Sequence, residues 1–92
     1  MAEIRTLKIA FEGGLQPGPK PWMWASVEVA LEDEGQIHPT VTARLPVPFE
    51  GQDVFEMREV AWAAFREALE QALAAGAGKS AQQLSFTGPE AR

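Results

Sequence analysis

The 92-residue sequence contains no cysteine and a single histidine, His38. The absence of cysteine excludes disulfide bonds, thiolate metal ligands and cysteine nucleophiles. One histidine leaves any transition-metal site dependent on carboxylates, whose spacing here does not indicate one. A catalytic histidine also needs an orienting carboxylate and a reactive group nearby, so we interpret His38 as an ordinary surface residue. We therefore expect no catalytic residues, no metal, no cofactor and no enzymatic activity.

Long apolar stretches and runs of basic residues are also missing. No segment approaches the length that spans a membrane, and the charged N-terminal residues lack the apolar region of a secretory signal. The net charge is −5, which repels phosphate backbones and acidic membrane surfaces. These absences predict a soluble, acidic, cytoplasmic protein that binds neither nucleic acid nor membranes.

What is present is the composition of a globular protein, with 46% hydrophobic and 23% charged residues. The chain is long enough for one domain and too short for two, so we expect one α+β domain over residues 1–92. Its core must be thin, and small domains of this kind often gain stability by oligomerising.

Three segments alternate apolar and polar residues in the manner of half-buried strands. They run over about 3–12, 22–32 and 36–47. Between the first two, residues 13–21 hold three glycines and three prolines, a composition that predicts a loop.

The segment Asp33–Gly35 is typical of a three-residue hairpin turn with glycine in third place. In the register that follows, Val27 lies opposite Val41, and Trp24 lies opposite Arg44. Apolar residues then face apolar residues, as the pleat of a sheet requires.

A helix is predicted over about 54–75, with Asp53 as its N-cap and Glu56 in the capping-box position. Its apolar side chains share one stripe and most of its glutamates the opposite side, so we expect it to cover one face of the sheet. Gly76 and Gly78 should end it.

The expected fold is therefore α+β: an antiparallel three-stranded meander backed by one long amphipathic helix. Leu84, Ser85 and Phe86 are candidates for a short fourth strand, because the first and last of them would share a face. Residues 88–92 are predicted to form a flexible tail.

Two charged features of the helix region have simple structural interpretations. Gly78-Lys79-Ser80 resembles the end of a phosphate-binding loop, but Leu73 stands where that pattern requires glycine, and a helix precedes it. The helix glutamates are typical of a solvated face. A role for them as an acidic decoy for a basic protein remains a third, less favoured hypothesis.

Arg58 lies within the apolar stripe near the start of the predicted helix. A buried charge is unfavourable unless it is paired. Two interpretations remain open: the side chain extends along the sheet margin to a strand carboxylate or to solvent, or its guanidinium contacts an anionic ligand.

The strongest functional signal is the pair Trp22 and Trp24, which alternation sends to the face of the sheet opposite the helix. Arg44, Thr42 and Lys8 should share that face, and aromatic residues with arginine are typical of interface hot spots. Stacking of Arg44 on Trp24 would add a cation–π contact. The alternatives are a bulge that turns one indole inward, or cover from the proline-rich loop or the C-terminal segment.

These observations favour a small protein-interaction module that acts as a homodimer or as an adaptor or inhibitor. Its expected partner is a protein, either a second copy or a different one, bound through Trp22, Trp24 and their neighbours. The alternative is a small-ligand-binding domain or accessory enzyme subunit, with a pocket between the proline-rich loop, Trp62 and the start of the helix near Arg58, which would contact an anion.

Overall fold

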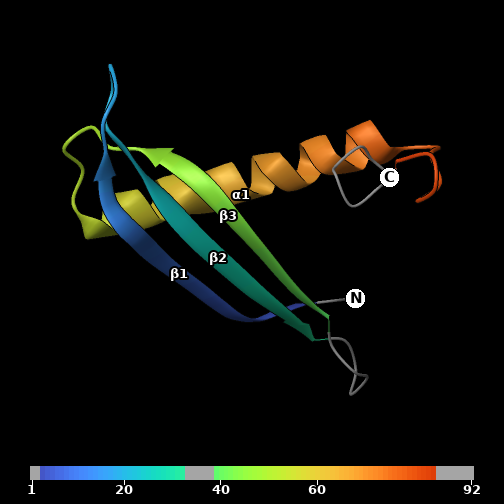
Figure 1. Ribbon diagram of the computed structural model, residues 1–92. Coiled ribbons are helices and arrows are strands. Elements are labelled where there is room, and N and C mark those ends of the chain that lie inside the picture. The colour runs from blue at the N-terminus through green and yellow to red at the C-terminus, as the bar shows by residue number, and fades with distance from the viewer. Residues whose placement is uncertain (1–2, 33–38, 85–92) are drawn as a thin grey trace.

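The structure is a computed structural model that describes residues 3–32 and 39–84. Its elements follow the chain in the order β1 (Glu3–Gln16), β2 (Trp22–Glu32), β3 (Thr40–Pro48) and α1 (Val54–Gly76). The strands form one antiparallel sheet in the order β1-β2-β3, and α1 packs on one face of it (Figure 1). The predicted α+β meander with a single long helix is confirmed.

The core lies between the helix and the inner face of the sheet, where the odd-numbered side chains of β2 meet α1. Alternation in β2 is uninterrupted, so its odd-numbered side chains, all apolar, face the helix, and its even-numbered side chains lie on the outer face. The buried side chains are those of Ala25, Val27, Val29, Val47, Met57, Ala61 and Phe65.

Strand β1 extends four residues beyond its predicted end at Glu12. Gly13 and Gly14 adopt positive φ angles of 76° and 66°, and the ladder resumes at Gln16, opposite Trp22. The register shift lies between Glu12 and Gln16. The prediction that the glycines end the strand was wrong, because left-handed glycines are accommodated as a bulge that bends a strand without ending it.

The register of β2 and β3 also differs from the prediction, by two residues. Val27 lies opposite Ala43, and Val41 lies opposite Val29. A two-residue slip keeps every side chain on its face, so the apolar pattern alone could not distinguish the two registers. The turn decides between them, and both the predicted turn Asp33–Gly35 and His38 lie within 33–38, outside the described residues.

A capping box begins α1, as predicted. The Glu56 N–H donates to Asp53 Oδ1 at 2.8 Å, and the Asp53 N–H donates to Glu56 Oε1 at 3.0 Å. The helix ends at Gly76, one residue later than predicted.

A second capped turn follows the helix at residues 80–84. The Ser80 N–H donates to Gln83 Oε1 at 2.8 Å, and the Gln83 N–H donates to Ser80 Oγ at 3.2 Å. Leu84 lies in this turn, where its N–H donates to Ser80 O at 3.2 Å, and so it does not begin a strand. The other residues of the predicted fourth strand, and the predicted tail, lie outside the described residues.

Helix α1 crosses the sheet near the end where β1 and β3 finish, and its C-terminal half projects past β3 (Figure 1). The radius of gyration is 16.0 Å, compared with about 12 Å for a compact chain of this length. Within residues 3–32 and 39–84, no helix combines the length and apolar character needed to cross a membrane.

Candidate functional site

The predicted aromatic face is formed by β2 and β3 on the outer side of the sheet. Trp24 lies opposite Pro46, and Trp22 lies opposite Pro48. We call these four residues together with Arg44 the tryptophan patch. No other described strand or helix covers this side of the sheet, because α1 packs on the inner face.

The hydrogen-bonding pattern brings these opposed side chains close together. The Leu31 N–H donates to Pro39 O, and the Phe49 N–H donates to Pro21 O. Odd-numbered pairs of β2 and β3 therefore exchange hydrogen bonds, and even-numbered pairs such as Trp24 and Pro46 do not. Pairs without these bonds have the shorter Cα separation, about 4.5 Å.

The two indoles meet edge to face, and Arg44 lies over Trp24. The ring centroids of Trp22 and Trp24 lie 5.0 Å apart with an interplanar angle of 81°. Arg44 Cζ lies 4.1 Å from the Trp24 ring centroid, in the predicted cation–π position. Both indoles are half-buried, although α1 lies on the other side of the sheet. These contacts hold the indoles in fixed orientations before any partner binds.

The alternative in which a bulge turns one indole inward does not occur. The register shift near the tryptophans lies in β1, between Glu12 and Gln16, and β2 continues without interruption. Trp22 and Trp24 therefore stay on the outer face together.

Lys8 and Thr42 share the outer face but lie away from the tryptophans. Both are opposite Glu28, which is four residues, or about 13 Å, along β2 from Trp24. Lys8 Nζ lies 3.9 Å from Glu28 Oε2, and both side chains are largely exposed. Such a pair contributes little to stability. Of the predicted interface residues, the structure brings only Arg44 against the two tryptophans.

Arg58 reaches the edge of the sheet from α1. Its Nη1 donates to Ile9 O in β1 at 3.4 Å, in a half-buried setting. Ile9 lies opposite Val27. The backbone groups of Val27, as of the other odd-numbered residues of β2, form hydrogen bonds with β3 and not with β1. The Ile9 carbonyl therefore points outward from the edge of the sheet. The guanidinium therefore reaches a strand carbonyl at the sheet margin, and the anion contact stays a prediction.

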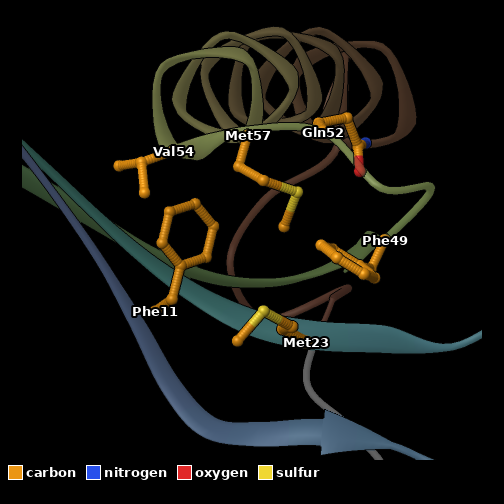
Figure 2. Close-up of a pocket in the computed structure, with 6 residues that line it drawn as sticks. All are labelled: Phe11, Met23, Phe49, Gln52, Val54 and Met57. Atoms are coloured by element: carbon orange, nitrogen blue, oxygen red, sulfur yellow. The ribbon is translucent and has the colours of Figure 1, made fainter.

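A pocket of about 280 Å³ opens at the start of α1 (Figure 2). It is lined by Phe11, Met23, Phe49, Gln52, Val54 and Met57. The amide of Gln52 is engaged at the start of the helix, where its Nε2 donates to Pro48 O at 3.2 Å and its Oε1 accepts from the Glu50 N–H. The pocket lies near the helix start, as predicted, but neither Arg58 nor Trp62 lines it. Its lining suits an apolar group.

The sequence interpretation missed a set of exposed apolar side chains on α1. Leu73 is 75% exposed and Phe55 79%, and Val54 and Leu69 are exposed at 67% and 38%. Val54 and Leu69 were expected to pack on the sheet. Helix length could have revealed the difference, because 23 residues span about 35 Å and a three-stranded sheet is only about 10 Å wide between its outer strand axes.

Among the described residues, no three Asp, Glu or His side chains lie close enough together to hold a metal ion. Comparisons with protein-family models, curated proteins and solved structures find no match to this chain. The tryptophan patch, the pocket and the exposed helix residues are therefore interpreted from their own chemistry.

Proposed function

We propose that the protein is a small interaction module, without enzymatic activity, that binds another protein through the tryptophan patch. The stack of Arg44 on Trp24 and of Trp24 against Trp22 carries this proposal. Tryptophan and arginine dominate binding hot spots, and aromatic groups already held in place lose little entropy on binding.

The patch favours a different protein over a second copy. Pairing two patches about a two-fold axis would bring two Arg44 guanidinium groups close together. One face of this guanidinium lies on Trp24, and its N–H edge can donate to a carboxylate. The expected partner therefore offers an apolar side chain next to an acidic one.

Photo-crosslinking from the middle of the patch tests the proposal. Ser26 lies opposite Arg44, and replacing it with p-benzoylphenylalanine should link the chain to its partner in source cells. The partner is then purified and titrated against the wild type, Trp22→Ser/Trp24→Ser and the control Thr40→Ala. We expect the double variant to bind at least about 30-fold more weakly, as hot-spot residues do.

Thr40→Ala should bind like the wild type, because Thr40 lies opposite Ala30, far along the face from the patch. Circular dichroism checks that each variant is folded. A folded double variant with unchanged affinity would contradict the proposal, as would crosslinking only to a second copy of the chain.

The pocket supports a second candidate function, the binding of a small apolar ligand. A neutral apolar fluorescent probe such as N-phenyl-1-naphthylamine should bind there. Val54→Glu, at the exposed rim, should weaken binding, and Arg58→Ala should not, because Arg58 lies outside the pocket lining. Equal binding by the wild type and Val54→Glu would argue against this candidate.

A further inference from the structure

An apolar stripe on one flank of α1 is only partly covered by the described part of the chain. Phe55, Trp62, Leu69 and Leu73 share this flank at 100° per residue. The first and last are 79% and 75% exposed, and Leu69 is 38% exposed. Trp62 is half-buried and stacks on Phe65, with ring centroids 5.7 Å apart. We call these four residues the helix stripe.

The helix stripe faces a second apolar surface, on the part of the sheet that α1 leaves uncovered. At 100° per residue Arg58 lies between the buried side chains of α1 and the helix stripe, and its guanidinium reaches Ile9 O in β1, so this flank faces the half of the sheet that α1 leaves uncovered. Ile4 lies opposite Leu31 there and is 50% exposed, and Leu31 and Val41 are half-buried. The helix stripe and the uncovered part of the sheet are thus two apolar surfaces that meet at an open angle.

We propose that a second copy of the chain fills this angle, with the two α1 helices packed antiparallel about a two-fold axis. The helix stripe is nearly symmetric about its own centre, close to Phe65. In an antiparallel pair centred between residues 64 and 66, Phe55 lies within about two residues of the position opposite the partner's Leu73, and Trp62 within about two residues of the position opposite the partner's Leu69. A dimer with a two-fold axis requires a surface that is complementary to itself, as the helix stripe is. Binding of an unrelated partner would not require this symmetry.

The same arrangement covers the exposed half of each sheet. The C-terminal half of each helix projects past its own sheet (Figure 1), so in the antiparallel pair it lies over the inner face of the partner's sheet. Leu69 and Leu73 then pack near Leu31 and Val41 of the other copy. Each chain supplies the cover that the other lacks.

Large apolar side chains on both surfaces are open to solvent: Phe55 and Leu73 on α1 are 79% and 75% exposed, and Ile4 on the sheet is 50% exposed. The tryptophan patch lies on the opposite side of the sheet, so this dimer leaves it free and goes beyond the function proposed above.

Crosslinking through introduced cysteines tests the register directly, because the natural chain has no cysteine. Arg66→Cys places a thiol beside the two-fold axis, where a short bismaleimide should join it to its twin. Glu67→Cys is the matched control, because the side chain of Glu67 points about 100° further from the helix stripe than that of Arg66. We expect at least tenfold more crosslinked dimer from Arg66→Cys. Equal yields, or no dimer, would overturn the proposal.

Sedimentation equilibrium gives an independent test. The wild type should be a dimer, and Leu73→Glu should raise the dissociation constant at least about 100-fold, because the two-fold axis buries the new charge twice. Trp22→Ser/Trp24→Ser should remain dimeric, which separates this proposal from partner binding at the patch. A monomeric wild type, a dimeric Leu73→Glu variant or a monomeric tryptophan variant would overturn it. Should Leu73→Glu fail to fold, the crosslinking result decides.

Discussion

At the scale of single residues, Asp53 stabilises the start of α1 through the capping box with Glu56. Replacing it with alanine leaves the Glu56 N–H without its acceptor at 2.8 Å. We expect Asp53→Ala to lower the free energy of unfolding by about 1 kcal/mol, and Asp53→Ser to stay close to the wild type. Urea denaturation measures both, and an alanine variant as stable as the serine variant would contradict the prediction.

Gly14 is predicted to resist substitution for a backbone reason alone. Its φ is 66°, and an added Cβ would meet no atom within 4 Å. Gly14→Ala should therefore cost about 1 kcal/mol from the left-handed conformation itself. Gly76→Ala is the control, because that glycine lies in α1 and its Cβ would make only an ordinary contact with Leu84 Cδ1 at 3.8 Å. Chemical denaturation should show Gly76→Ala to be as stable as the wild type or slightly more so.

The contact between Arg44 and Trp24 shows which residue-level features the sequence could predict. Alternation placed both side chains on the outer face, and they are there. The sequence predicted that the two residues lie directly opposite, whereas Trp24 lies opposite Pro46 and Arg44 opposite Ser26. The stacking survives because a diagonal neighbour on the same face is still within reach of a long side chain.

At the scale of elements, the two halves of α1 have different surroundings. The first half packs on the sheet through Met57, Ala61 and Phe65, and the second half passes beyond β3. The apolar periodicity continues through both halves, so it could not predict where contact with the sheet ends. Sheet width determines that point. Similarly, the Ser80–Gln83 capping box matches a sequence signature that predicts a helical turn, and the turn takes in Leu84, where a strand was expected to begin.

Phe65 should be the most sensitive position in α1. Its side chain is 1% exposed and is among the largest that are fully buried. Phe65→Ala should lower the free energy of unfolding by about 3–5 kcal/mol through lost burial and the cavity left behind. Ala63→Ser, on the exposed side of the same helical turn, should change it by less than about 0.5 kcal/mol. Guanidinium denaturation of the two variants tests this, and similar midpoints would contradict it.

At the scale of the whole molecule, a small core supports an extended shape. Seven side chains are buried among residues 3–32 and 39–84, while the radius of gyration is 16.0 Å. Composition predicted a thin core and hence a gain from oligomerisation. The residues with which copies associate depend on how α1 crosses the sheet, and that angle has no signature in the sequence.

The proposed dimer predicts that stability depends on concentration. When two chains fold together, mass action raises the melting temperature as total protein increases. We expect the wild type to melt several degrees higher after a hundredfold increase in concentration, and Leu73→Glu to show no such rise. Differential scanning calorimetry at several concentrations measures this, and a constant wild-type melting temperature would contradict it.

The prolines of β3 have a consequence for how the sheet can grow. Even-numbered residues of β3 point their backbone groups away from β2, and Pro46 and Pro48 have no N–H to offer there. On the other margin, Arg58 occupies the outward carbonyl of Ile9. Neither margin presents an unbroken row of donors and acceptors to an incoming strand. These interruptions disfavour the addition of a further strand at either margin, so we expect concentrated solutions to contain discrete particles and no fibrils.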